Sequence, residues 1–251
     1  MYYVFSVWRA ALFAQRAKFY YLSLTYLIEQ ITVNPHILCL MDYLSPTYFY
    51  DYESDEIEVF ISEFRNTTLS KKEIAKQLYL KVRDTWRYNP YNLSLNKEKY
   101  RASEIAKRTN GHCIDKSIVL IASLRALDIP ARIHLAKVKN HIGVERLIEK
   151  FGSNELTPHG MVDVFLNDKW LKISPTFNAS LCAMLNVAPL DFDGENDAVL
   201  QPFNEEGTQF MEYLEDYGHF EDLPIAFMVK NAREHYPNIF NADSKQTEFL
   251  L

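Results

Sequence analysis

The chain has 251 residues and a mass of 29.4 kDa, and a folded protein of this size buries roughly three quarters of the surface that its unfolded chain exposes. With 48% hydrophobic residues, 24% charged residues and only 7 Gly and 10 Pro, the composition excludes the disordered, collagen-like and low-complexity classes. A formal net charge of −6 argues against a protein that binds nucleic acid through a broad basic face, so we expect no nucleic acid among its partners.

The cysteines, Cys39, Cys113 and Cys182, are odd in number and form no C-x-x-C pair. This pattern predicts neither a disulfide framework nor a structural zinc site, and it favours a reducing, cytoplasmic location. No group of histidines and cysteines has the spacing of a metal site, so we expect neither a metal nor another cofactor. The chemistry that remains is that of one reactive thiol.

Residues 1–40 differ from the rest of the chain, because they are basic and aromatic and their first acidic residue is Glu29. Their charge-free stretches are too short for a membrane-spanning helix, and the pattern is not that of a secretory signal. We expect an N-terminal helical extension that packs on a main domain over 41–251. Two alternatives stay open: the extension contacts a membrane surface, or Met41 is the biological start.

The first half of the main domain predicts helices. Residues 70–73, Ser-Lys-Lys-Glu, have the form of a capping box and predict a helix start. Apolar side chains four residues apart give that helix one buried face: Ile74, Leu78, Val82 and Trp86. After a short helical segment over 102–107, a turn signal precedes a second helix over 113–127. That helix is apolar over much of its circumference, so we expect it to be central and buried.

From Ile129 onward the hydrophobic period changes to two, which predicts strands. The first strand covers 130–136, and two more, over 159–166 and 170–174, form a hairpin around Asn167-Asp168. Helices therefore come first and an antiparallel sheet follows. We predict an α+β fold in which N-terminal helices precede a central buried helix packed on an antiparallel β-sheet.

A two-residue turn at 167–168 sets a hairpin register in which His159 lies directly opposite Thr176, with Ser174 one diagonal step away. These side chains share the face opposite to the apolar side of the hairpin. A residue that orients an imidazole belongs at this place. The same register pairs Phe165 with Trp170, Val164 with Leu171 and Val162 with Ile173.

Cys113 lies in the first turn of the predicted central helix. Unpaired N–H groups and the helix dipole stabilise negative charge there, so the pKa of this thiol is expected to fall into the reactive range. The same N–H groups could hold an oxyanion when the thiolate attacks a carbonyl. A cysteine at a helix start is also often a small buried hydrophobe, and this alternative stays open until a base is found.

The segments around Cys113 and His159 together resemble the transglutaminase-like superfamily, over roughly residues 70–178. The segments that carry the resemblance are Gly111-His112-Cys113-Ile114-Asp115-Lys116-Ser117, then Leu124-Arg125-Ala126-Leu127-Asp128-Ile129-Pro130-Ala131-Arg132, then His159 with the strand through Trp170 to Ser174-Pro175-Thr176. The resemblance implies a papain-like Cys-His site, with Cys113 as nucleophile and His159 as the base that later protonates the leaving amine. It implies acyl transfer through a thioester on Cys113, by an amide or peptide hydrolase or a transglutaminase. The substrate would be a peptide, a protein or a small amide.

Two positions depart from the pattern of this superfamily. Asp128 stands where the superfamily has glycine, and Ser174 stands where it has the triad aspartate. The aspartate's role therefore does not pass to Ser174, although Ser174, Thr176 or Asn178 could act as a neutral orienter. Because a hydroxyl stabilises an imidazolium less than a carboxylate does, the alternative function is a catalytically weak or inactive binding module on the same fold.

We expect His112, Trp86 and Trp170 to line the substrate cleft, with core packing as the alternative for Trp86. Residues 179–222 hold 11 acidic and no Lys or Arg residues, and we expect a solvated acidic segment. A calcium loop over 191–197 is an alternative that its glycine and its final position do not fit. If this segment borders the site, it would favour cationic or amine-bearing ligands.

Overall fold

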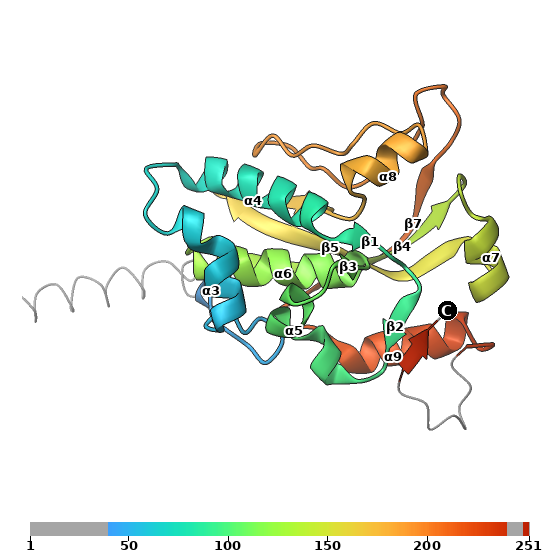
Figure 1. Ribbon diagram of the computed structural model, residues 1–251, viewed down its shortest axis with the longest axis horizontal. Coiled ribbons are helices and arrows are strands. Elements are labelled where there is room, and N and C mark those ends of the chain that lie inside the picture. The colour runs from blue at the N-terminus through green and yellow to red at the C-terminus, as the bar shows by residue number, and fades with distance from the viewer. Residues whose placement is uncertain (1–39, 240–247, 251) are drawn as a thin grey trace, which may run out of the picture. The chain divides into compact units, whose positions relative to one another are not determined.

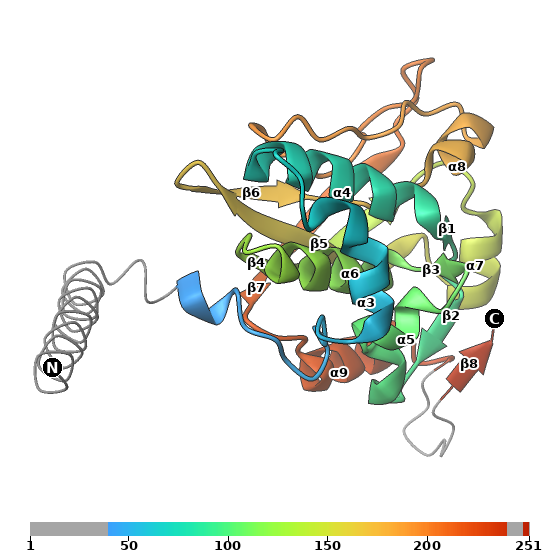
Figure 2. The ribbon, with the colours of Figure 1, turned by 60° about the vertical axis from the view of Figure 1, so that its left-hand side comes forward.

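A computed structural model describes residues 40–239 and 248–250, and Figures 1 and 2 show it from two directions. The predicted extension over 1–40 therefore lies outside the described residues, apart from its last position, and so does Cys39. The fold described below is that of the unit Tyr43–Leu251. Among the described residues, no helix is both long enough and apolar enough to cross a bilayer.

A four-stranded antiparallel sheet forms the centre of this unit, with the strand order β6-β5-β4-β7. Its strands are β4 at Ala131–Asn140, β5 at Glu155–Leu166, β6 at Lys169–Ile173 and β7 at Met211–Phe220. Strand β5 is hydrogen bonded to a neighbour on each side. The strand that carries His159 is therefore an inner strand of the sheet.

The β5–β6 hairpin has the predicted register. Asn167 and Asp168 have φ angles of 49° and 62°, the left-handed values that a type I′ turn requires at both central residues. Because the turn has two residues, the apolar side chains of both strands face the same side. The observed pairs are Phe165 with Trp170, Val164 with Leu171 and Val162 with Ile173.

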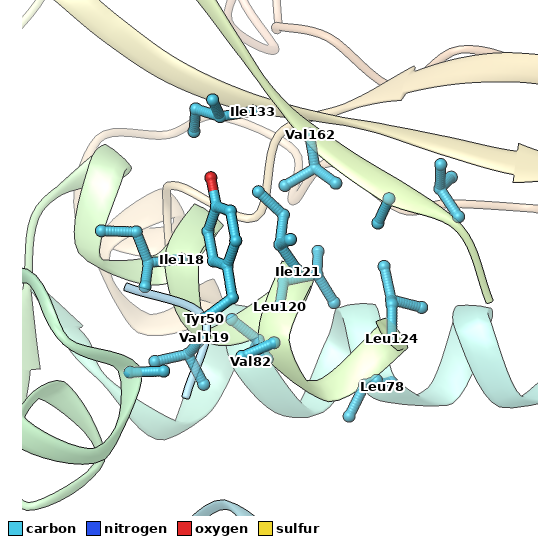
Figure 3. Close-up of a cluster of buried hydrophobic side chains, with 14 of the residues drawn as sticks. Tyr50, Leu78, Val82, Ile118, Val119, Leu120, Ile121, Leu124, Ile133 and Val162 are labelled. Atoms are coloured by element: carbon cyan, nitrogen blue, oxygen red, sulfur yellow. The ribbon is translucent and has the colours of Figure 1, made fainter. Parts of the chain in front are cut away.

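Helix α6, Cys113–Ala126, packs on β4 and β5 and is buried along its whole length, as its apolar circumference predicts. Figure 3 shows its side chains between the sheet and helix α4, Lys71–Thr85. The residues drawn from α6 include Ile118, Val119, Leu120, Ile121 and Leu124, which lie among Ile133 and Val162 of the sheet and Leu78 and Val82 of α4. The predicted α+β arrangement, with a central helix on an antiparallel sheet, is confirmed.

Helix α4 begins where the capping box predicts. The Ser70 hydroxyl oxygen accepts the backbone N–H of Glu73 at 3.2 Å, which satisfies one of the unpaired donors of the first turn. The predicted apolar face is buried, and it ends in Trp86, whose indole N–H donates to the backbone oxygen of Ile105. The helix therefore covers the side of α6 that the sheet leaves open.

Shorter elements complete the unit. The helices are α3 at Asp55–Ile61, α5 at Ala102–Ala106, α7 at Glu145–Phe151, α8 at Ala179–Met184 and α9 at Ile225–His235, with 3-10 turns η1 at Ser62–Phe64 and η2 at Lys97–Tyr100. Parallel strands β1, Arg87–Tyr88, and β3, Asn110–Gly111, lie just before α6, and β2, Asn92–Ser94, pairs antiparallel with β8, Glu248–Leu250. A second apolar cluster, which includes Ala136, Met161, Phe177 and Phe210, lies on the face of the sheet opposite to α6.

Most acidic side chains of the segment 179–222 are exposed, as expected of a solvated segment, and the segment also contains α8 and β7. Its carboxylates bind the protein itself: Asp191 pairs with Arg83, and Asp193 accepts the backbone N–H groups of Glu195 and Asn196. Within the described residues, no three His, Cys, Asp or Glu side chains gather at a place that could hold a metal ion. The acidic loop at 191–197 is therefore an Asx turn anchored on α4.

Candidate active site

Cys113 is the first residue of α6, and His112 is the N-cap of that helix. The imidazole Nδ1 of His112 accepts the N–H of Asp115 at 3.3 Å, and the Asp115 carboxylate accepts the N–H of His112 at 3.1 Å. This reciprocal cap holds the start of the helix in one conformation. It also leaves the N–H groups of Cys113 and Ile114 to the sulfur, where they act to lower the pKa of the thiol.

Burial nevertheless raises the pKa of the Cys113 thiol to about 11, against an ordinary value of 9.0. The residue is only 7% exposed, and the loss of hydration disfavours the thiolate more than the nearby N–H groups favour it. The lowering expected from the helix start alone is thus outweighed. In the resting site, Cys113 is a neutral thiol at pH 7.

Strand β5 brings His159 to the start of α6. The backbone N–H of Gly160, the residue after His159, donates to Sγ of Cys113 at 3.4 Å. A methyl group on Gly160 would lie 2.8 Å from Cγ1 and 2.9 Å from Cα of Ile114, so only glycine permits this approach of strand and helix. The fold therefore places the thiol beside the backbone that carries His159.

The imidazole of His159 is buried and neutral. Burial, with a smaller contribution from the charge of His112, lowers the pKa of His159 from 6.5 to about 4. The residue is 1% exposed, and its Nδ1 has no hydrogen-bond partner among the described residues. The site therefore combines a neutral thiol with a neutral imidazole that has one ring nitrogen available.

The residues expected to orient His159 are engaged elsewhere. The hydroxyls of Ser174 and Thr176 bond to each other at 2.8 Å. The Asn178 side chain accepts the N–H of Tyr88 and donates to Ser180. In the part of the chain that the structure describes, none of these three side chains is hydrogen bonded to the His159 imidazole.

Ser174 lies just past the paired part of β6. The pairing of β6 with β5 ends at Ile173, and the backbone N–H of Ser174 donates to the oxygen of Ala198 on the side of β6 away from β5. The expectation that the hairpin continues to a Thr176–His159 pair is therefore corrected. The segment after β6 leaves the sheet before it reaches the level of His159.

Lys116 is a site residue that the sequence reasoning missed. It lies one turn after Cys113, is fully buried, and its ammonium group donates to the backbone oxygens of Arg83 and Thr176, both at 2.8 Å. Burial lowers the pKa of Lys116 to about 7. The signal was a lysine in a helix predicted to be buried over much of its circumference, since a lysine is almost never fully buried without partners. It ties the segment after β6 to α6 and to the end of α4.

Cys113 and His112 line a pocket whose empty space, its open mouth included, is about 730 Å³. Its walls come from the turn after β1, from β2, from the start of β5 and from α9, which Figures 1 and 2 place on the same side of α6 as β2. Representative lining residues are Tyr88, Leu93, Tyr100, Met228, Val229 and Tyr236. Among the described residues of this lining there is no Asp, Glu, Lys or Arg.

Of the residues expected to bind substrate, His112 lies in the pocket lining, whereas the two tryptophans lie elsewhere. Trp86 is 1% exposed and packs in the core against Phe60, with ring centroids 5.2 Å apart. Trp170 lies at the turn end of the β5–β6 hairpin, where its ring is 4.0 Å from the guanidinium carbon of Arg132. The expectation for these two residues is corrected, because helix packing and cation–π contact account for them.

Comparison with known proteins gives one family. Residues 60–175, which include Cys113, His159 and Ser174, match the transglutaminase-like superfamily. A solved structure from Cytophaga hutchinsonii, described as a "putative cysteine protease", is similar at a TM-score of 0.47 and 15% identity, over 75% of this chain and 49% of that chain. The present chain thus spans about half the length of that protein. No curated protein matches the chain significantly.

Proposed function

Because the chain belongs, through residues 60–175, to the transglutaminase-like superfamily, we propose that it is a cysteine-dependent acyl-transfer enzyme. Cys113 is the proposed nucleophile, His159 the base, and the donor an amide or a peptide. The observation that carries the proposal is the 3.4 Å hydrogen bond from the N–H of Gly160 to Sγ of Cys113, which joins the thiol to the strand of His159 at the edge of a pocket.

The protonation states of the site determine the order of events. Since the thiol and the imidazole are both neutral at pH 7, His159 takes the thiol proton as Sγ attacks the donor's carbonyl carbon and the S–C bond forms. The imidazolium then protonates the leaving nitrogen as the C–N bond breaks. Water attacks the resulting thioester while His159 accepts a proton from that water, and the imidazolium then passes this proton to Sγ as the S–C bond breaks, which restores the neutral thiol and the neutral imidazole. We favour hydrolysis over transfer to an amine, because water is always available to a thioester.

The developing negative charge on the carbonyl oxygen needs hydrogen-bond donors. The N–H groups of Cys113 and Ile114 are in the first turn of α6, where they have no acceptor within the helix. They are the proposed donors for the oxyanion, and the helix dipole adds to their effect. Lys116 has a positioning role, since it fixes the segment after β6 relative to the same turn.

One observation favours a second function, a binding module that uses the same pocket without catalysis. The imidazolium that forms in the mechanism would have no carboxylate beside it, and the pKa of His159 is already lowered to about 4 by burial. Without such a partner, the charged intermediate state of the site is costly. In that case the protein would bind a ligand in the same pocket without catalysing a reaction.

Mass spectrometry of the intact full-length chain separates the two functions. We would incubate it with a library of peptide amides and glutamine-containing peptides, then look for an acyl adduct that neutral hydroxylamine removes, as expected of a thioester. Cys113→Ala should abolish the adduct and product release, while Cys182→Ala, which alters another buried free cysteine, should retain both. An adduct that persists in Cys113→Ala would exclude the proposed nucleophile. Absence of any adduct or product from a folded wild-type protein would favour the binding module.

A further inference from the structure

We propose that the pocket at Cys113 selects an acyl donor whose substituent is uncharged and apolar, aliphatic or aromatic, in preference to one whose substituent is charged or carries a second carboxamide. This inference rests on the proposed function for its chemistry, because the acyl carbon must reach Sγ of Cys113. The inference concerns the substituent on the acyl carbon, which fills the pocket when that carbon reaches Sγ. The argument comes from the charge, the hydrogen bonding and the walls of the pocket.

The first argument is charge. Among the described lining residues there is no carboxylate, ammonium or guanidinium group. His112, the one imidazole in the lining, has its pKa lowered by burial and uses Nδ1 to accept the N–H of Asp115. A charged substituent would therefore lose its hydration in the pocket without gaining an ionic partner. The acidic residues of 191–197 do not line the pocket, so they offer no such partner.

The second argument is that the polar groups of the lining are already paired. The Tyr100 hydroxyl donates to the oxygen of Ser94, and the Tyr236 hydroxyl donates to the oxygen of Glu155 and accepts the N–H of Thr157. The Thr157 hydroxyl is bonded to Asn231. A second carboxamide in the substituent behind the acyl carbon would bring two donors and an acceptor, and these bonds leave little to receive them.

The hydroxyl of Tyr88 is the exception to this pairing of polar groups in the lining. Its hydroxyl oxygen is buried and has no hydrogen-bond partner in the described part of the chain. Tyr88 and Cys113 line the same pocket. The Tyr88 hydroxyl is thus one hydrogen-bond donor in an otherwise apolar lining that also contains Cys113. Such a lining suits a ligand with one carbonyl oxygen and a hydrocarbon substituent.

The third argument is the wall that α9 contributes. Ile225, Met228, Val229 and Ala232 line the pocket at spacings of one helical face, while Ala226 and Lys230 on the other side of the helix are exposed. Met228 is 7% exposed, so this wall is held in the apolar interior. Flexible methionine and branched aliphatic side chains suit hydrocarbon of variable shape.

Isothermal titration of the full-length Cys113→Ala protein with unreactive amides tests the selection without requiring catalysis. The probes are acetamide, butyramide, hexanamide, phenylacetamide and the charged succinamic acid. We expect affinity to rise from acetamide to hexanamide by roughly fourfold for each added methylene, with phenylacetamide binding and succinamic acid at the level of acetamide or below. Equal affinity along the series, or tighter binding of succinamic acid, would overturn the proposal.

A matched pair of variants on α9 locates the binding. Ala232→Leu adds hydrocarbon inside the pocket, whereas Ala226→Leu makes the same change on the exposed side of the same helix. We expect Ala232→Leu to remove at least tenfold of the hexanamide affinity and Ala226→Leu to leave it within twofold. If both variants bind hexanamide like the parent protein, the ligand lies elsewhere and the proposal fails. The probe series does not depend on the α9 variants, so a poorly folded Ala232→Leu protein does not remove the test.

A second experiment, which compares acylation rates at Cys113, tests this proposal separately from the proposed function. Acetyl, hexanoyl and succinyl p-nitrophenyl esters acylate reactive thiols, and the mass of the wild-type chain after peptide mapping reports acylation at Cys113. Faster hexanoylation, by at least tenfold over acetylation, supports both proposals. Hexanamide binding without any acylation of Cys113 supports the apolar selection and counts against the enzyme. Acylation at equal rates by all three esters supports the nucleophile and overturns the selection.

Discussion

The backbone N–H of Gly160 donates a hydrogen bond to Sγ of Cys113 at 3.4 Å. This hydrogen bond joins the first residue of α6 to an inner strand of the sheet, and it depends on the missing side chain at position 160. It is local in space but links residues 47 positions apart in sequence. The position of the Cys113 thiol relative to the strand of His159 therefore depends on how the start of α6 packs against β5.

Gly160→Ala should disturb this packing. Its new methyl group would lie 2.8 to 2.9 Å from Cγ1 and Cα of Ile114, so helix and strand must separate. We expect the free energy of unfolding to fall by about 1–3 kcal/mol, as in other overpacked cores, and any Cys113-dependent activity to fall with it. Urea denaturation measures the first effect. Adding Ile114→Ala should rescue little, because the clash with the backbone of residue 114 remains, and full rescue would show that the side chain alone is the obstacle.

Stability should depend on pH through His159. Its pKa is about 4 in the folded protein against 6.5 ordinarily, so between these values the unfolded chain binds a proton that the folded protein does not. The free energy of unfolding therefore keeps its full value, as far as His159 is concerned, above pH 6.5. It falls by roughly 3 kcal/mol as the pH is lowered toward 4. Urea denaturation from pH 4 to 7 should show a smaller loss for His159→Gln than for the wild type. As a control, His235→Gln at the end of α9 should follow the wild type, and identical curves for all three proteins would contradict the prediction.

Ser174→Asp should activate the thiol. The resemblance to the transglutaminase-like superfamily places a carboxylate here, and a carboxylate near His159 would raise the pKa of the imidazole and stabilise its charged form. We expect iodoacetamide to alkylate Cys113 at pH 7 at least tenfold faster than in the wild type, with Cys182 followed as the internal reference. The neutral isostere Ser174→Asn should leave the rate within threefold. Equal rates for the two variants would mean that position 174 does not reach His159.

Lys116→Met should destabilise the protein. The variant leaves the buried backbone oxygens of Arg83 and Thr176 without their donor. We expect a loss of about 2–4 kcal/mol in the free energy of unfolding, because each unsatisfied buried carbonyl costs about 1–3 kcal/mol and the methionine recovers part of this by its apolar contacts. Lys230→Met, on the exposed side of α9, should change stability by less than about 0.5 kcal/mol. A Lys116→Met protein as stable as that control would refute the positioning role.

Asp128 lies at the position where the superfamily has glycine, and its φ angle of 57° explains that preference. Asp128→Gly should keep or raise thermal stability, by up to about 1 kcal/mol, because glycine adopts left-handed φ values without steric cost. Asp128→Val should lower it by about 1–2 kcal/mol, because a β-branched side chain tolerates that region poorly. Differential scanning calorimetry compares the three proteins, and a stable valine variant would contradict the assigned cause.

The elements that were predicted correctly carry local signals. The cap at Ser70, the two-residue turn after Leu166 and the apolar stretch after Cys113 each act over a few residues, and each is where the sequence places it. Strand β7 was missed because it pairs with β4 across a long connection, and its acidic residues hide the alternation. Helix α9 had a usable signal, since its pocket-facing residues recur at three- and four-residue intervals.

The members of the candidate site could be proposed from the sequence, whereas the pKa shifts of its groups could not. Cys113 and His159 can be picked out from sequence, because their segments resemble a known pattern. The direction of the thiol's pKa shift depends on how tightly sheet, helix and pocket enclose the sulfur, which is a non-local property. The hydrophobic pattern that predicts the hairpin also does not mark the end of the β5–β6 pairing at Ile173, just before Ser174.

The proposed base and much of the pocket wall belong to different parts of the chain. His159 lies on an inner strand of the four-stranded sheet, whereas α9 and β2, which line the pocket proposed to hold the substituent of the acyl donor, lie outside that sheet. Substitutions in α9 and β2 are therefore expected to disturb the positions of Cys113 and His159 little. In a laboratory evolution experiment, libraries restricted to α9 should therefore yield altered acyl preferences at a higher frequency of folded proteins than libraries restricted to β5.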